Sequence, residues 1–262
     1  MNINLSKKNA VVCGSTRGIG KAAALELAAN GANVTLLSRN EIMLKGVIKE
    51  LSNDGSQKHG FIAVDFSHPQ KLKEKIKRFA GNNPPVHILV NNTGGPKPGE
   101  IVNADISEFR MAFEQHLICN HILVQALIPG MKKEKYGRII NIISTSVKEP
   151  IDRLGVSNTI RAAVASWAKT LSFELGSYGI TVNNVLPGST KTDRLTSIIE
   201  SVSKSYGISV KDAEKDWLSK VPAARFGEPG ELAGVIAFLA SPASSYINGV
   251  SLAVDGGRTR SI

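Results

Sequence analysis

The chain has 262 residues, 42% of them hydrophobic and 5% aromatic, and 32 Lys and Arg against 22 Asp and Glu give it a formal charge of +10. A chain of this length buries roughly 70–75% of the surface that it exposes when unfolded, enough for a large core. Ordinary charge density excludes wholesale disorder. No apolar run reaches the roughly 20 residues of a membrane-spanning helix, and residues 1–8 lack a secretory signal. We expect a soluble, cytoplasmic protein that does not associate with membranes.

The basic excess bears on partners and leaves open nucleic acid, a membrane surface or anionic small molecules. Its densest runs, residues 71–78 and 132–135, are interleaved with acidic or apolar residues, as on a solvated helix face. No zinc-finger spacing, aromatic stacking pattern or basic zipper accompanies the charge, so nucleic-acid binding is not expected. Two cysteines cannot build a disulfide framework, and the histidines lack metal-ligand spacing, so no metal is expected.

Short apolar runs alternate with longer amphipathic stretches along the whole chain. The predicted strands are residues 10–13, 34–38, 61–64, 88–90, 138–143, 181–186 and 250–254. The predicted helices are residues 19–30, 40–51, 72–80, 107–132, 161–178 and 228–240. Strands joined by helical crossovers form a parallel sheet with helices on both faces. The pattern predicts one doubly wound α/β domain over residues 1–262, with about seven strands and with residues 192–222 inserted over the substrate.

A glycine-rich segment, residues 14–20 (Gly-Ser-Thr-Arg-Gly-Ile-Gly), joins the first predicted strand to the first predicted helix. Glycine lets the backbone turn tightly and approach a pyrophosphate, whose charge then meets the helix N-terminus. The spacing Gly-x3-Gly-x-Gly is a weak signal alone, but its place between a strand and a helix favours dinucleotide binding. The predicted contacts are Gly14, Ser15, Thr16, Arg17, Gly18, Ile19 and Gly20.

The end of the second predicted strand distinguishes between two cofactors. An acidic residue there would bind the adenosine ribose hydroxyls of NAD and repel a 2′-phosphate. This chain has Ser38, Arg39 and Asn40 instead. Arg39 and Arg17 could hold a phosphate from two sides, because guanidinium forks match phosphate oxygens. We therefore expect NADP(H) with Ser38 and Arg39 among its contacts.

These motifs resemble the short-chain dehydrogenase/reductase family over nearly the whole chain, and the β-ketoacyl carrier-protein reductases most of all. The resemblance implies a Rossmann-type fold. It places Asp65 at the adenine and the Asn91-Asn92-Thr93-Gly94 turn at the nucleotide. It also places Pro187, Gly188 and Thr190 at the nicotinamide carboxamide. The family is mostly tetrameric or dimeric, so the resemblance implies a homotetramer or homodimer.

The catalytic segment departs from the family's pattern. Ser144 fits the family's serine after the fifth strand. The family's Tyr-x3-Lys pair is replaced by Ser157 and Arg161, and His116 stands at the family's helical asparagine. A serine hydroxyl is a far weaker acid than tyrosine, and an arginine stays protonated, so proton delivery is in question. Arg161 can still hold the cofactor ribose.

Several groups could replace the lost proton donor. His116 titrates near neutrality if its helix turns it inward, and Lys148, Asp152 and Tyr206 lie in segments that could reach the substrate. The alternative for each of these side chains is a role in packing or at the surface. The sequence around Ser157 lacks the second glycine of a hydrolase elbow, which argues against a serine hydrolase.

The sequence predicts an NADP(H)-dependent oxidoreductase that reduces a carbonyl and resembles 3-oxoacyl-[acyl-carrier-protein] reductases of fatty acid metabolism. The expected partners are a small carbonyl or acyl thioester substrate and an acidic carrier protein. The alternative is a catalytically weak nucleotide-binding sensor or partner subunit of the same fold. The missing tyrosine and lysine motivate this alternative.

Overall fold

The computed structural model describes residues 3–261, so the predicted domain extends beyond the described chain by residues 1, 2 and 262. Seven strands form one sheet. They are β1 (Asn9–Cys13), β2 (Asn33–Ser38), β3 (Gly60–Ala63), β4 (Ile88–Asn91), β5 (Gly137–Ile142), β6 (Ile180–Pro187) and β7 (Ser251–Val254). The order across the sheet is β3-β2-β1-β4-β5-β6-β7, and every neighbouring pair is parallel. The predicted seven-stranded parallel sheet is confirmed.

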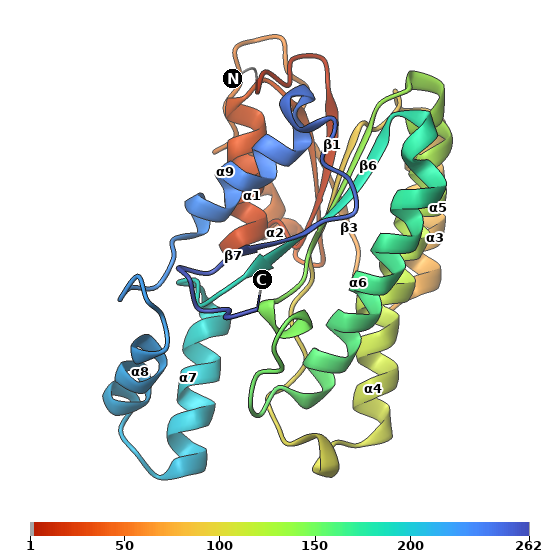
Figure 1. The fold of residues 1–262 in the computed structure, drawn as a ribbon. Helices are drawn as coiled ribbons and strands as arrows, with labels where there is room; N and C mark the ends of the chain where they lie inside the picture. Colours follow the sequence, from red (N-terminus) through yellow and green to blue (C-terminus); the bar gives the residue numbers. More distant parts are fainter. Residues whose placement is uncertain (1–2, 262) are drawn as a thin grey trace.

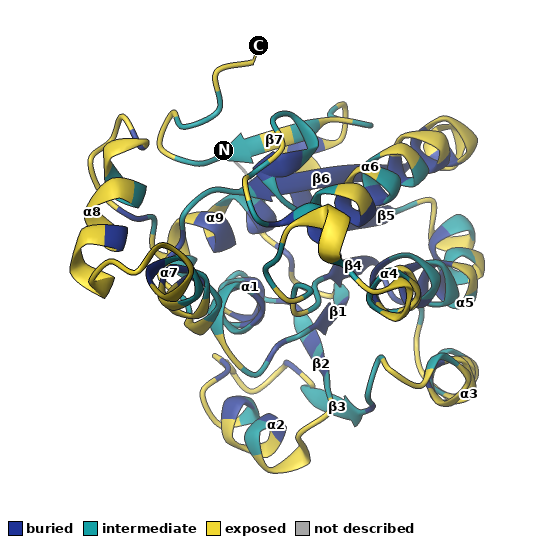
Figure 2. Ribbon diagram, turned by 90° about the horizontal axis from the view of Figure 1, so that it is seen from below, coloured by how far each residue is buried: buried dark blue, intermediate teal, exposed yellow. Residues whose placement is uncertain are grey.

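Helices cover both faces of this sheet (Figures 1 and 2). One face is covered by α1 (Gly18–Ala29), α2 (Glu41–Ile48) and α9 (Pro229–Ala240). The other face is covered by α3 (Pro69–Asn82), α4 (Ile106–Phe113), α5 (Cys119–Glu134) and α6 (Gly155–Leu175). Two further helices, α7 (Asp193–Tyr206) and α8 (Val210–Ser219), lie beyond the end of the sheet in Figure 1.

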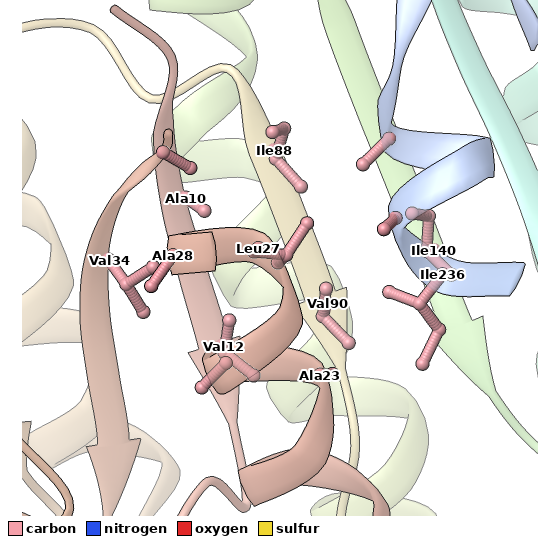
Figure 3. Close-up of a cluster of buried hydrophobic side chains, with 14 of the residues drawn as sticks. Ala10, Val12, Ala23, Leu27, Ala28, Val34, Ile88, Val90, Ile140 and Ile236 are labelled. Atoms are coloured by element: carbon pink, nitrogen blue, oxygen red, sulfur yellow. The ribbon is translucent and has the colours of Figure 1, made fainter. Parts of the chain in front are cut away.

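The core follows from strand alternation. Successive side chains of a strand point to opposite faces, so Ala10 and Val12 of β1 join the cluster under α1 and α9, whereas Val11 and Cys13 join the cluster under α3, α5 and α6. Figure 3 shows Leu27 of α1 among these side chains. A sheet buried on both faces favours continuous apolar strands, which explains the apolar runs of β1 and β4.

The structure differs from the predicted elements in three places. Helix α6 begins at Gly155, six residues before the predicted start, so Ser157 and Arg161 lie one turn apart on the same helix. The long predicted helix 107–132 is divided by a π-helical turn, Glu114–Ile118. The segment 192–222 contains the two helices α7 and α8, which share a small apolar cluster of their own around Leu195 and Phe226.

The topology fixes where a ligand can lie. The chain returns from β3 across the sheet to β4, so the strand order reverses between β1 and β4. Loops on either side of such a reversal turn away from each other and leave a crevice at the carboxyl ends of the strands. The segments after β1, β4 and β5 therefore face a common opening.

Two further observations concern the cysteines and the hydropathy of the helices. Cys13 and Cys119 are buried and form no disulfide. No helix within residues 3–261 is long and apolar enough to cross a membrane.

The close packing of the β1–α1 turn gives a stability prediction. A Cβ atom on Gly20 would lie 2.3 Å from the Gly14 carbonyl oxygen, whereas one on Gly46 of α2 would meet nothing within 4 Å. We expect Gly20→Ala to lower the free energy of unfolding by about 1–3 kcal/mol because the turn must open. Gly46→Ala, the matched control, should raise it by about 0.5–1 kcal/mol. Urea unfolding measures both, and equal effects of the two variants would contradict this account.

Candidate active site

A cavity of about 740 Å³ opens at the carboxyl ends of the strands. Its walls are the segments that follow β1, β2, β3, β4, β5 and β6, together with the start of α6 and one side of α7. This volume lies in the range of small-molecule and cofactor sites. The segments that the sequence singled out for chemistry thus meet at one place.

The glycine-rich turn forms one end of the cavity. Gly14 and Gly18 adopt positive φ angles of 59° and 55°, which L side chains rarely adopt. The N-cap of α1, Arg17, makes no side-chain cap hydrogen bond, so the first N–H groups of the helix are free of such a cap. Uncapped N–H groups at a helix N-terminus attract anions. This end of the cavity suits the phosphates of a dinucleotide.

The two arginines predicted to hold a 2′-phosphate differ in their surroundings. Arg39 lines the cavity just after β2 and also lines an adjoining basic hollow. Arg17 lines the cavity as well, but its Nη1 lies 2.7 Å from Asp193 Oδ2 in a largely exposed ion pair. Of these two arginines, Arg39 is the one that forms no ion pair with any residue of the range 3–261.

Asp65 lines the cavity next to Arg39. The backbone N–H of Ser67 donates to its carboxylate at 2.9 Å. This hydrogen bond, with a smaller contribution from the charge of Arg39, lowers the pKa of Asp65. The group is thus a fixed anion that can accept hydrogen bonds from an amino group such as that of adenine.

Most of the predicted cofactor residues line the cavity. They are Gly14, Thr16, Arg17, Gly18, Ile19, Ser38, Arg39, Asp65, Thr93, Gly94, Arg161, Pro187, Gly188 and Thr190. Ser15, Gly20 and Asn91 are not part of the lining, and their contact with a cofactor stays a prediction. The Ser15 hydroxyl accepts from the Leu37 N–H at 3.1 Å, and the Asn91 amide donates to Asn141 Oδ1 at 2.8 Å across the sheet. These side chains are buried behind the lining and shape it.

Ser157 and Arg161 both line the cavity from α6. The Arg161 guanidinium donates from Nη1 to the Ile142 carbonyl at 2.9 Å and from Nη2 to the Thr93 carbonyl at 3.4 Å. These carbonyls lie at the end of β5 and just after β4, so one side chain joins the ends of two neighbouring strands. Its remaining N–H donors are not used by protein hydrogen bonds among residues 3–261.

The charge of Arg161 is poorly compensated. Burial, together with repulsion by Arg194, lowers its pKa to about 10, so it remains a cation at neutral pH. Arg194 is half-buried, its pKa is lowered by burial, and its Nη2 donates to the Pro96 carbonyl at 2.6 Å. No carboxylate of residues 3–261 forms an ion pair with either arginine. Burying an ion costs several kcal/mol unless it is paired, so this half of the cavity favours negative charge.

His116 lies behind the cavity wall and not in it. It is 1% exposed, and its Nδ1 is hydrogen-bonded to the Thr93 hydroxyl. Burial, then repulsion by Arg161 and Arg194, lowers its pKa well below the usual value, so the imidazole is neutral. The helix turns His116 inward, which was the condition for a role as proton source, but the side chain is buried and its imidazole is neutral. His116 can act on the cavity only through Thr93.

The other suggested proton donors do not line the cavity. Lys148 and Asp152 lie outside its lining, and Tyr206 is 61% exposed with its ring 5.7 Å from the guanidinium carbon of Arg153. Within residues 3–261 no tyrosine, lysine or histidine is part of the wall. The segments after β4 and β5 and the start of α6 contribute hydroxyl groups to the wall, those of Thr93, Ser144, Thr145 and Ser157. Ser144 Oγ accepts from the Ser146 N–H at 3.1 Å, which leaves its own proton free to be donated.

Among the cavity residues that sequence reasoning missed, two are basic, Arg194 and Arg258. Arg194 lies in the first turn of α7 and packs against Gly95, where an added Cβ would lie 3.0 Å from its Nη2. Arg258 follows β7, and its Nη1 donates to the Thr145 hydroxyl at 3.4 Å. The sequence gives no signal for Arg194 beyond its basic side chain, because no local pattern shows that α7 folds back over the cavity.

The chain matches the model of a family described as enoyl-(acyl carrier protein) reductase over residues 14–259. It is 32% identical to the NADPH-dependent reductase BacG of Bacillus subtilis, over 98% of this chain and 100% of the relative. It is 34% identical to the 3-oxoacyl-[acyl-carrier-protein] reductase FabG of Vibrio cholerae, over 97% of this chain and 98% of the relative. The chain belongs to the short-chain dehydrogenase/reductase family. It is an oxidoreductase of that family, as the resemblance predicted.

Solved structures agree with this assignment. The crystal structure of YwfH, an NADPH-dependent reductase involved in bacilysin biosynthesis, superposes with a TM-score of 0.89 at 32% identity and covers 98% of this chain and 100% of its own. L-Sorbose reductase from Gluconobacter frateurii, complexed with NADPH and L-sorbose, gives a TM-score of 0.92 at 28% identity with full coverage of both chains. The Rossmann-type fold predicted for a short-chain dehydrogenase/reductase is confirmed.

The buried His116 gives a pH prediction. Its pKa is lowered in the folded state, so below about pH 6.5 the unfolded chain takes up a proton that the folded chain does not. The free energy of unfolding should therefore fall with acidification by up to about 1.4 kcal/mol per pH unit from this residue. In His116→Asn that contribution is absent, so the variant should lose less stability than the wild type between pH 7 and 5. Urea unfolding at a series of pH values measures this, and parallel curves would contradict the buried neutral imidazole.

Proposed function

We propose that the protein is an NADP(H)-dependent reductase that adds a hydride to a substrate carbonyl carbon and a proton to its oxygen. The observation that carries the proposal is the buried Arg161 cation beside Ser144 and Ser157, in a cavity whose other end suits a dinucleotide phosphate. NADPH-dependent reductases among the relatives and neighbouring structures support it.

NADP(H) is the cofactor, and each part of it has matching residues. The turn Gly14–Gly18 and the start of α1 would hold the pyrophosphate. Arg39 would bind the 2′-phosphate, Asp65 the adenine, and Thr190 with Pro187 and Gly188 the carboxamide. Arg161 would donate to the nicotinamide ribose with N–H groups that its carbonyl partners leave free. When bound, NADPH supplies the hydride.

The chain's own groups then handle the developing negative charge. Ser144 donates a hydrogen bond to the carbonyl oxygen and polarises it, and Arg161 places a positive charge nearby. A preorganised cation in a water-poor site stabilises an oxyanion far more than it would in water. Ser157 lies one turn from Arg161 and would hold a water molecule at the place of the family's tyrosine. The proton reaches the oxygen from solvent through these hydroxyls, with Thr93 and the neutral His116 as a second route.

The relatives suggest a substrate class. Acyl thioesters of the 3-oxoacyl-[acyl-carrier-protein] type are the first substrates to test, because FabG proteins are among the relatives. The basic helix faces would attract an acidic carrier protein.

The assembly that we propose is a homotetramer or homodimer. It is supported by exposed apolar side chains on α4, on α6 and around β7, such as Ile106, Phe173 and Leu252. Sedimentation velocity would distinguish these assemblies from a monomer. We place the protein in the cytoplasm.

A second function is favoured by one observation. The cavity wall within residues 3–261 contains no tyrosine, lysine or histidine that could deliver the proton as the family's tyrosine does, whereas its cofactor end is intact. The same geometry would suit a nucleotide-binding sensor or partner subunit that turns over slowly. The two functions differ in turnover and agree on nucleotide binding.

Turnover distinguishes these functions. We expect NADPH oxidation with at least one member of a panel of acetoacetyl thioesters, neutral ketones and oxo acids. Arg161→Met should lower kcat by about 100-fold or more, because the oxyanion loses its cation. Arg161→Lys should restore part of it, and Lys169→Met, an exposed cation on the same helix, should have no effect. NADPH binding without oxidation of any panel member would overturn the enzyme in favour of the sensor.

Nucleotide selectivity tests the cofactor end separately. We expect Arg39→Ala to raise the Kd of NADPH by about tenfold or more with little change for NADH, since a charge-assisted hydrogen bond to the 2′-phosphate is lost. Arg17→Ala should have the smaller effect, because Asp193 already pairs with Arg17. Arg78→Ala, on the exposed face of α3, is the control. Fluorescence titration measures each Kd, and equal weakening of both nucleotides by Arg39→Ala would contradict the assignment.

A further inference from the structure

Two positive charges of the cavity, Arg161 and Arg194, have no negative partner, whereas the third arginine beside them, Arg258, interacts electrostatically with Asp255. Arg161 enters from α6 and Arg194 from the first turn of α7, and each contributes to the electrostatics of His116, which places both near the same buried point. Their hydrogen bonds in the structure go to neutral backbone carbonyls. Asp193, beside Arg194 in sequence, is paired with Arg17.

The cofactor phosphates are poorly placed to supply the missing charge beside Arg161. The phosphate-binding turn follows β1 and Arg39 follows β2, whereas Arg161 spans the ends of β4 and β5. Neighbouring strands are about 4.8 Å apart, so Arg161 lies roughly 5–10 Å across the sheet from that turn. A hydrogen-bonded ion pair does not form over that distance.

Apolar side chains also line the cavity on the elements that carry the two arginines. Leu195, Ile198 and Trp217 line the side of α7 and α8, and Ile151 and Leu154 line the side of α6. Such a chamber suits a carbon skeleton with one charged end. The guanidinium of Arg194 is planar and has N–H donors beyond the one that binds Pro96, and this fork matches a carboxylate.

We propose that the substrate is an oxo acid, whose carboxylate binds Arg194 while its reacting carbonyl oxygen faces Arg161. The proposal rests on the reductase function above and names its substrate class. Two arginine charges are then balanced in the transition state by one carboxylate and one developing oxyanion. A phosphate dianion would balance both before reaction and leave no cation for the oxyanion, and a neutral ketone or thioester would leave Arg194 unpaired.

Binding of matched neutral and anionic probes tests this without turnover. The probes are propanoate, hexanoate and phenylacetate with their amides, titrated calorimetrically into the NADP⁺-loaded protein. We expect at least one carboxylate to bind about tenfold or more tightly than its amide. Arg194→Met should abolish this preference and Arg194→Lys should retain part of it. Lys204→Met, which removes an exposed cation from the same helix, should leave it unchanged.

The other outcomes overturn the proposal in distinguishable ways. Equal or absent binding of every acid and amide would exclude a carboxylate subsite, while reduction of a neutral carbonyl by the same preparation would keep the proposed function. A preference that survives Arg194→Met would place the subsite elsewhere. A tenfold weaker NADP⁺ affinity in Arg194→Met with unchanged probe selectivity would assign Arg194 to the cofactor. Failure of the wild type to bind NADPH would remove both proposals. Arg194→Gln replaces Arg194→Met if circular dichroism shows the latter unfolded.

Discussion

The site depends on one buried guanidinium. Arg161 reaches from α6 to the carbonyls of Ile142 and Thr93 and so ties the ends of β5 and β4 together at the point where the cavity opens. A lysine ammonium is a compact point charge, whereas a guanidinium is a rigid fork that can bind two carbonyls and still present donors to a ligand. With arginine in place of the family's lysine, the side chain would still present donors to the cofactor proposed for this cavity. The replacement also removes a group able to exchange protons near neutral pH.

The field of Arg161 explains its neighbours. His116 stays neutral because burial disfavours its charged form and because a third cation would be repelled by Arg161 and Arg194. A neutral imidazole can hold the Thr93 hydroxyl in place, and Thr93 in turn lines the cavity. The π-helical turn Glu114–Ile118 widens the helix at the position of His116 and lets the ring point toward the sheet. Loss of the tyrosine, gain of the arginine and the histidine behind the wall thus form one rearrangement.

The fold was predictable because its signals are local. Strand alternation, helix periodicity and the glycine turn are each contained within a few residues, and all seven strands lie within two residues of their predicted bounds. The start of α6 was missed because Gly155 and Ser157 have weak helix propensity, and packing overrides it. The cavity residues were predictable where a motif carries them, as with Arg39. Arg194 and Arg258 were not, because their place depends on how α7 and the chain after β7 fold back.

The unpaired charges also separate binding from catalysis. An enzyme accelerates a reaction only through interactions that are stronger in the transition state than in the ground state. In the proposed reaction Arg161 would meet this condition, because the oxygen that it faces gains charge as the hydride arrives. Arg194 would not, since a carboxylate has the same charge throughout the reaction. On this proposal Arg194 would set which substrate is held and Arg161 how fast it reacts, so the two arginines of one cavity would carry specificity and rate separately.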